Sequence, residues 1–117
     1  PEVSIRKLAL ACGCDYVRVI NTFKLEQVVT TYKEAFERED TAVIISKAPC
    51  TLIKGLTKKP PVQFVEKNCN NCDKCVSELA CPAISKINGK ITIDQSQCDG
   101  CNVCIQVCKY GALEAGR

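Results

Sequence analysis

The sequence contains no histidine, no methionine and no tryptophan among its 117 residues, and only 5% of them are aromatic. Without histidine, the chain cannot form Cys2His2 zinc fingers, Rieske centres, His-ligated haem or a catalytic site that uses histidine as acid or base. Any metal bound here by a soft side chain must therefore be bound through sulfur. The absence of methionine is a first indication that the stretch belongs to a longer protein.

Long apolar runs and a strong charge bias are also lacking. No run approaches the roughly 18 apolar residues of a membrane span, and no charged-then-apolar leader is found. Sixteen Lys and Arg residues against thirteen Asp and Glu leave a net charge of +3, too little to indicate nucleic-acid binding. We therefore expect no membrane partner and no nucleic-acid partner.

Cysteine is the residue in excess, with eleven copies. The number is odd, so complete disulfide pairing would leave a free thiol. Eight of the eleven lie within residues 69–108. This clustering predicts a metal site in the second half of the chain.

Two motifs with the same spacing carry these eight cysteines. Each has three cysteines separated by two residues and a fourth further along, the pattern of bacterial ferredoxins in which the fourth cysteine ligates the other 4Fe–4S cluster. We assign a cluster I set, Cys69, Cys72, Cys75 and Cys108, and a cluster II set, Cys98, Cys101, Cys104 and Cys81. The sequence thus predicts two 4Fe–4S clusters with exchanged fourth ligands.

An internal repeat supports this assignment. A shift of 29 residues aligns the two motifs and also Ala83-Ile84 with Ala112-Leu113. Between the motifs, the segments 84–87 and 90–93 flank Asn88-Gly89, a pair that favours a type I′ hairpin turn. We expect a ferredoxin-like domain with pseudo-twofold symmetry.

Structural zinc is the competing interpretation. Zinc sites take four ligands, usually as two separated CxxC pairs, and have no role for a third cysteine two residues on. Iron and acid-labile sulfide would exclude zinc.

The first half predicts an incomplete α/β lobe. Helical spacing begins after Ser4, residues 16–20 and 41–46 are apolar and β-branched, and an amphipathic helix runs from Leu25 to about Glu39. Two strands and two helices are too few to cover their apolar faces. We place this lobe at residues 1–57, a Pro-Pro linker at 58–63 and the cluster domain at 64–117, which gives an α+β chain.

The whole chain resembles the C-terminal part of the large subunit of indolepyruvate:ferredoxin oxidoreductases. The resemblance rests on GCDYVRVINTFKLEQVV, on AVIISKAPC and on the cluster motifs with CPAI. It implies that residues 1–57 end a thiamine-diphosphate-binding domain, with thiamine diphosphate and magnesium bound upstream. The implied reaction converts an aryl 2-oxoacid and coenzyme A into an acyl-CoA, CO2 and reduced ferredoxin.

The resemblance also implies partners and a location. The partners are the rest of the same subunit, a smaller subunit and ferredoxin as external acceptor, and the location is a cytoplasm low in oxygen. This stretch would carry electrons without catalysing the carbon chemistry. A stand-alone ferredoxin-type carrier, a subunit of another 2-oxoacid oxidoreductase and a zinc-held interaction module are the alternatives.

Two positions depart from the ferredoxin pattern. Lys109 replaces the proline that usually follows the fourth cysteine, which could open cluster I to water. Cys81 has five residues between it and its motif where Cys108 has three, so a failure to reach cluster II would leave a three-iron centre.

Several other residues are expected to have no role in the site. Free cysteine is usually a small buried hydrophobe, the interpretation we favour for Cys12, Cys14 and Cys50. Lys58-Lys59 is expected to be a solvated charge pair. Tyr110 and Phe64 are expected to pack and not to relay electrons.

Overall fold

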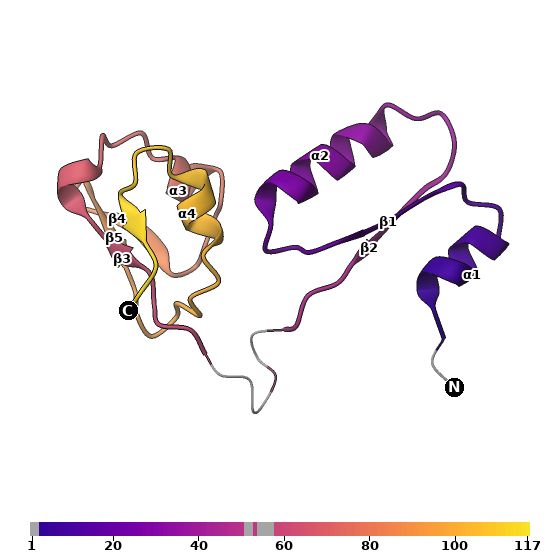
Figure 1. Cartoon of the computed structure of the whole chain (residues 1–117). Coiled ribbons are helices and arrows are strands. Elements are labelled where there is room, and N and C mark those ends of the chain that lie inside the picture. The colour runs from indigo at the N-terminus through magenta and orange to yellow at the C-terminus, as the bar shows by residue number, and fades with distance from the viewer. Residues whose placement is uncertain (1–2, 51–52, 54–57) are drawn as a thin grey trace. The chain divides into compact units, whose positions relative to one another are not determined.

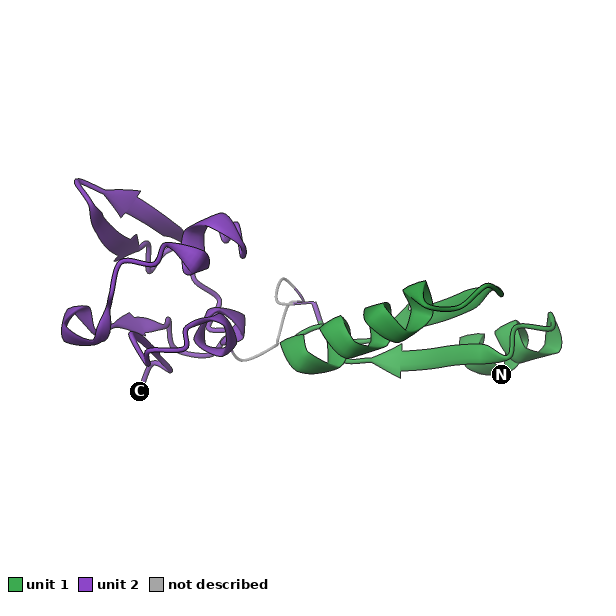
Figure 2. Ribbon diagram, turned by 90° about the horizontal axis from the view of Figure 1, so that it is seen from above, with its two compact units in different colours: residues 1–49 green, residues 50–117 purple. Residues whose placement is uncertain are grey.

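The structure is a computed structural model, and it describes residues 3–50, 53 and 58–117. Two compact units divide the chain, unit 1 at Pro1–Pro49 and unit 2 at Cys50–Arg117 (Figure 2).

Unit 1 has the predicted order of helix, strand, helix and strand (Figure 1). Its elements are α1 (Ile5–Ala11), β1 (Tyr16–Ile20), α2 (Leu25–Phe36) and β2 (Ala42–Ser46). Ser4 caps α1 by accepting a hydrogen bond from the Lys7 backbone nitrogen at 3.3 Å. The two strands pair in parallel, from Tyr16 opposite Ala42 to Ile20 opposite Ser46. These elements confirm the sequence predictions, although α2 ends at Phe36, three residues early.

The core of unit 1 is small. Tyr16, Val17 and Ile20 are buried, and the Tyr16 hydroxyl donates a hydrogen bond to Glu34 Oε2 at 2.8 Å. Val19 remains 43% exposed and Phe36 84% exposed. We expected β2 to be buried on both faces, but its apolar residues are only half-buried. The unit therefore lacks the layers that would cover its apolar side chains.

Unit 2 contains short helices and two pairs of short strands, joined by loops that carry the cysteines (Figure 1). Its elements are β3 (Gln63–Phe64), η1 (Glu66–Asn68), α3 (Lys74–Ser77), β4 (Ile84–Ile87), β5 (Lys90–Ile93), α4 (Val103–Val107) and β6 (Leu113–Glu114). The pairs are β3 with β6 and β4 with β5, both antiparallel. Asn88 and Gly89 have φ of 50° and 79°, which confirms the predicted hairpin turn.

The 29-residue repeat extends to the backbone. Phe64 pairs with Leu113, and Ile93 pairs with Ile84, which are the same two positions after the shift. Likewise, the Val65 nitrogen donates to the Ala112 oxygen at 2.9 Å, and the Asp94 nitrogen donates to the Ala83 oxygen at 2.8 Å. The two halves of unit 2 therefore share strand register as well as cysteine spacing.

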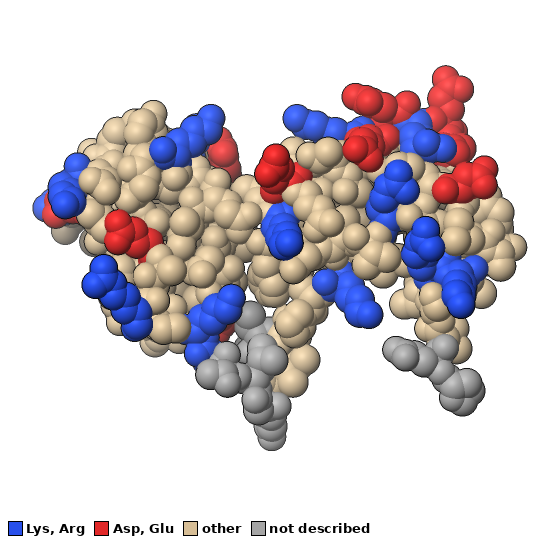
Figure 3. All heavy atoms as spheres, in the orientation of Figure 1, with Lys and Arg blue, Asp and Glu red and all other residues tan. Residues whose placement is uncertain are grey.

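Apolar side chains from both halves form the core of unit 2. The buried members come from residues adjoining the cysteine loops: Val62, Ile84, Ile91, Cys104 and Leu113. Five further cysteines of the two motifs pack against them while remaining partly exposed: Cys69, Cys75, Cys81, Cys98 and Cys108. Charged side chains of both signs lie around the core on the face viewed in Figure 3.

Residues 58–62 belong to unit 2 and pack against the rest of that unit. Val62 is buried, with only 2% of its surface exposed, and Lys58 Nζ lies 3.2 Å from Asp99 Oδ1. Part of the predicted boundary near residue 57 falls outside the described residues. The division into domains at 1–57, 58–63 and 64–117 stays a prediction.

Candidate metal centres

The backbone of each motif turns sharply on both sides of its middle cysteine. Asn71 and Asp73 flank Cys72 with φ of 58° each, and Gly100 and Asn102 flank Cys101 with φ of 64° and 62°. Glycine, asparagine and aspartate are the residues that adopt this left-handed conformation most readily. Both loops can therefore curl around a bound group in the same way.

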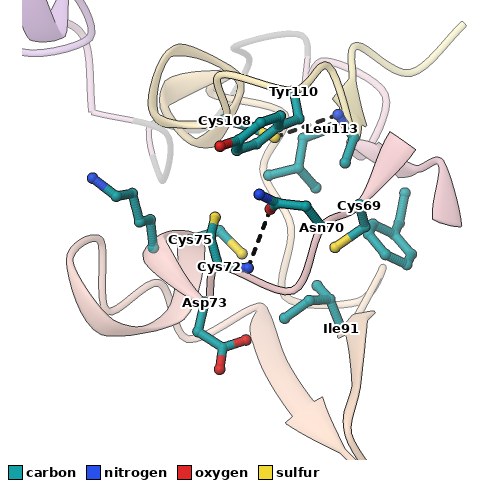
Figure 4. Close-up of a pocket in the computed structure, with 12 residues that line it drawn as sticks. Cys69, Asn70, Cys72, Asp73, Cys75, Ile91, Cys108, Tyr110 and Leu113 are labelled. Atoms are coloured by element: carbon teal, nitrogen blue, oxygen red, sulfur yellow. Dashed lines mark hydrogen bonds between the residues drawn. The ribbon is translucent and has the colours of Figure 1, made fainter. Parts of the chain in front are cut away.

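Four cysteines line one cavity in unit 2 (Figure 4). They are the cluster I set, Cys69, Cys72, Cys75 and Cys108, and the cavity also has apolar walls from Phe64, Ile91 and Leu113. Its empty volume, including the open mouth, is about 370 Å³. The asparagine that follows Cys69 also lines the cavity, and Asn70 Oδ1 accepts a hydrogen bond from the Cys72 nitrogen at 3.2 Å.

The electrostatic neighbours of Cys75 come from both motifs. Burial raises the pKa of the Cys75 thiol, and the nearby Cys108, Cys69 and Cys72 raise it further. Cys108 belongs to the second motif, so this group contains the exchanged ligand predicted from the sequence.

Cys104 is the centre of the matching second group. Burial raises the pKa of the Cys104 thiol to about 11, and the neighbouring Cys101, Cys81 and Cys98 contribute to the rise. Cys81 thus lies with the three cysteines of the other motif, despite its longer approach. Cys104 is buried, whereas Cys75 is only half-buried, so the second group is the more enclosed.

Backbone amides donate to sulfur in both groups. The Ala112 nitrogen lies 3.3 Å from Cys108 Sγ, the Asn71 nitrogen 3.4 Å from Cys69 Sγ and the Val62 nitrogen 3.4 Å from Cys98 Sγ. Such bonds favour a negatively charged sulfur over a protonated one. They are the kind of contact that tunes iron–sulfur potentials.

Donor chemistry and shape fit iron–sulfur clusters. Each group offers four sulfur atoms beside apolar side chains, with backbone N–H groups directed at sulfur. In the described part of the chain, no three Cys, Asp or Glu side chains converge as ligands of a single metal ion. A four-iron cluster instead takes each thiolate at a separate iron, so its ligands surround a cube.

The structure identifies residues that the sequence reasoning missed. Val62 falls inside the predicted linker, yet it is buried and donates to Cys98. The alternation of apolar residues at Val62 and Phe64 could have indicated a strand starting there. No role was predicted from the sequence for Asn70, Asn71 and Asn102. Asparagine next to a motif cysteine nevertheless favours a left-handed backbone there, as Asn71 and Asn102 show.

The remaining cysteines and the lysine pair lie apart from these groups. Cys12 and Cys50 are exposed, not buried as predicted, because the short α1 and the segment after β2 leave them at the surface. Cys14 is half-buried. Lys58 is paired with Asp99, whereas the sequence predicted it to be only solvated. Among the described helices, none has the length and apolar character to span a membrane.

Comparison with known proteins gives one domain match and several related chains. The model of a 4Fe–4S binding domain matches residues 90–113. The indolepyruvate oxidoreductase subunit IorA of Methanothermobacter marburgensis is 38% identical over 114 residues, which is 97% of this chain and 18% of the relative. The subunit of the same name from Pyrococcus horikoshii is 32% identical over 124 residues, 99% of this chain and 19% of the relative.

A shorter similarity, over less than half of this chain, is found to another kind of protein. A tetrathionate reductase subunit of Archaeoglobus fulgidus is 44% identical over 54 residues, 44% of this chain and 26% of the relative. By contrast, the similarity to the IorA subunits extends through unit 1, and this chain spans about a fifth of their length. The resemblance predicted from the sequence is thereby confirmed: over nearly all its residues, this chain is similar to the indolepyruvate oxidoreductase subunits named IorA.

Proposed function

We propose that unit 2 binds two 4Fe–4S clusters and relays electrons within an indolepyruvate:ferredoxin oxidoreductase. The observation that carries the proposal is the grouping of eight thiols into two sets of four, each drawing one thiol from the other motif. The similarity to IorA subunits over 97% of the chain supports the choice of enzyme. The stand-alone carrier is not favoured, because that similarity includes unit 1.

The chain's own residues would hold and tune the clusters. Cys69, Cys72, Cys75 and Cys108 would ligate cluster I, and Cys98, Cys101, Cys104 and Cys81 would ligate cluster II. When bound, a 4Fe–4S cluster supplies reversible one-electron transfer. Ile91 and Leu113 in the cavity wall would limit water near cluster I. The N–H groups of Val62 and Ala112 would stabilise negative charge on sulfur.

Burial of the thiols is compatible with this role. Burial raises the pKa of the Cys104 thiol to about 11, so ionising it in the metal-free chain is harder than for an ordinary thiol. Cluster binding would release the proton, because thiolate is the form that ligates iron. The iron would then compensate the mutual repulsion of the four sulfur atoms.

Pseudo-twofold symmetry of the cluster domain is part of the proposal. It is supported by the repeated strand pairs, by the repeated Val65 and Asp94 hydrogen bonds and by the matching left-handed positions around Cys72 and Cys101. A symmetric domain also accounts for the exchange of fourth ligands, since each half then gives the other a cysteine, although Cys81 and Cys108 lie two positions out of register in the repeat.

Residues 1–57 would form the end of a larger thiamine-diphosphate-binding domain, with thiamine diphosphate and magnesium held upstream. The exposed apolar side chains of unit 1, such as Val19 and Phe36, are what the edge of a larger domain would leave uncovered. The rest of the subunit, a smaller subunit and ferredoxin are the proposed partners. A cytoplasmic, low-oxygen location remains our expectation, because such clusters are sensitive to oxidation.

Metal analysis of anaerobically purified protein tests the cluster proposal. We expect brown protein with absorption near 400 nm and with iron and acid-labile sulfide in equal amounts, about eight of each per chain for two four-iron clusters. Zinc at stoichiometric level without sulfide would contradict the proposal. For the enzyme, oxidation of indolepyruvate should require the full-length subunit, whereas residues 1–117 with clusters should not turn over.

A further inference from the structure

We infer that electrons leave unit 2 from cluster I, at a docking face for an acidic one-electron carrier protein centred on Cys72 and Tyr110. The inference rests on the proposed function and adds to it a direction of electron flow and the surface used. It comes from a difference in how the two cysteine loops are covered.

The cluster II loop lies beneath residues 58–62. The Val62 nitrogen donates to Cys98 Sγ at 3.4 Å, and Lys58 Nζ lies 3.2 Å from Asp99 Oδ1. Gly100 is buried, and a Cβ at that position would lie 2.5 Å from the Pro60 carbonyl oxygen. Hence the backbone of residues 59–60 excludes any other protein from this side of the loop.

The cluster I loop has no such cover. Asn71, which corresponds to Gly100 in the repeat, is exposed. All eight motif thiols lie in the described part of the chain, and Cys72 is the only exposed one. Tyr110 is 53% exposed and lines the same cavity, beside Cys108 (Figure 4). A partner can therefore approach cluster I more closely than cluster II.

The segment that covers the cluster II loop also comes directly before the cysteine motifs in the sequence. Residues 58–62 join the cluster domain to everything N-terminal to it, including the proposed thiamine-binding part. Cluster II would thus receive electrons from within the subunit, and cluster I would deliver them outward.

The charge around the cluster I opening fits an acidic partner. Lys74 lines the cavity and lies 3.4 Å from Glu78, Asp73 of the same lining is paired with Lys86, and Lys109 is exposed between Cys108 and Tyr110. Lys67 is exposed next to Asn68, whose Nδ2 donates to the Gly111 oxygen at 3.0 Å. Among the described residues, neither Lys67 nor Lys109 has a carboxylate partner, unlike Lys58. Unpaired lysines speed association with an acidic partner and add specificity.

Zero-length cross-linking locates the face directly. The full-length subunit with its clusters would be mixed with an oxidised, net-negative two-cluster bacterial ferredoxin and treated with a carbodiimide, which joins lysine to carboxylate. We expect cross-links at Lys67, Lys74 or Lys109 that disappear at high salt. Cross-links confined to Lys58 and Lys59 would overturn the inference.

Charge reversal supplies an independent measure. For the Lys67→Glu/Lys109→Glu variant we expect the dissociation constant of the ferredoxin to be about tenfold larger at low salt. The rate of ferredoxin reduction should fall by a similar factor. Reduction of an uncharged quinone should not change. Lys59→Glu is the matched control, since it reverses an exposed lysine beside Gly100, and it should leave both values within twofold.

The outcomes separate this inference from the proposed function. A protein without iron and sulfide would contradict the proposed function itself. A loaded protein in which Lys59→Glu weakens ferredoxin binding more than the double variant would reverse the assigned face. A loaded protein in which neither variant has an effect would exclude an electrostatic docking face at cluster I.

Discussion

The two cysteine loops of unit 2 share a backbone but differ in their surroundings. Both turn through left-handed residues on either side of the middle cysteine, and both are followed by a short helix. Yet Gly100 is buried under residues 59–60, whereas Asn71 at the equivalent position is exposed. Under the proposed function, what packs against each copy of this duplicated loop would give the two copies different roles without any change in their ligands.

Exchanging the residues at positions 71 and 100 should have the largest effect on the difference between the two loops. Gly100→Asn introduces a side chain where a Cβ alone would lie 2.5 Å from the Pro60 carbonyl oxygen and 2.8 Å from Lys59 Cβ. Asparagine tolerates the left-handed backbone, so the clash is the cause of any damage. We expect the variant to lose about half of its iron, measured per chain after anaerobic reconstitution, since one of two equal clusters is affected.

The reverse exchange is the control for that experiment. Asn71→Gly removes an exposed side chain and keeps a residue that adopts φ of 58° easily. Its iron content should match that of the parent protein. Equal losses in both variants would contradict the difference in cover between the loops.

Oxidation should distinguish the clusters next most clearly. Cys72 is exposed, so the iron that it would bind under the proposed function would be the one most open to oxidants and water. Brief ferricyanide treatment should release about one iron per chain and produce the EPR signal of one three-iron centre, from cluster I. In the Cys108→Ala variant, which damages cluster I beforehand, that oxidation signal should not increase further. An unchanged yield in this variant would place the labile iron in cluster II.

A charge change beside cluster I gives a smaller, electrochemical effect. Asn70 lines the cluster I cavity without charge, whereas Asp99 at the equivalent position is paired with Lys58. Asn70→Asp adds a negative charge that disfavours the reduced cluster, so the potential of cluster I should fall by some tens of millivolts. Protein-film voltammetry would resolve it. Asp99→Asn should shift cluster II less, because the lysine already compensates that charge.

The turn before the cluster II loop supplies the smallest effect. Hydrogen bonds from Ser96 and Gln97 lower the pKa of Asp94 to about 2. The ionised side chain therefore stabilises the fold above its usual pKa of 3.8, and this stabilisation disappears as pH falls from about 4 to 2. Asp94→Asn should lower the temperature of cluster bleaching by a few degrees at pH 7.

The pH dependence identifies the cause of that effect. As the pH falls below 4, the parent protein should lose its advantage over Asp94→Asn, because its carboxylate becomes protonated. Thermal unfolding of both metal-free proteins, followed by far-UV circular dichroism, would measure the difference, since the clusters themselves release sulfide in acid. A difference that stays constant down to pH 2 would mean that the charge of Asp94 is not responsible.

Spacing and periodicity predicted the parts of the molecule that depend on local chemistry. Asn88-Gly89 specified the hairpin, Ser4 the start of α1, and two short apolar, β-branched runs the two parallel strands of unit 1. The grouping of Cys81 with Cys98, Cys101 and Cys104 also follows the ferredoxin spacing predicted from the sequence.

Contacts between distant residues were not predictable in the same way. The double proline at 60–61 indicated an extended linker, and its backbone is indeed not helical. Only tertiary packing places Pro60 over Gly100 and Val62 beside Cys98, because these residues are about 40 positions apart in sequence. Likewise, the exposure of Cys12 depends on which layers surround unit 1, and spacing does not encode that.

Paired cysteine removals, followed by Mössbauer spectroscopy and iron and sulfide analysis, test the exchange of ligands most directly. In Cys81→Ala/Cys101→Ala, both changes fall in the cluster II set, so one intact four-iron cluster should remain. In Cys81→Ala/Cys72→Ala, the changes fall in different sets, so no intact four-iron cluster should remain. The opposite pattern, with an intact cluster only in Cys81→Ala/Cys72→Ala, would show that each motif binds its own four-iron cluster and would contradict the account.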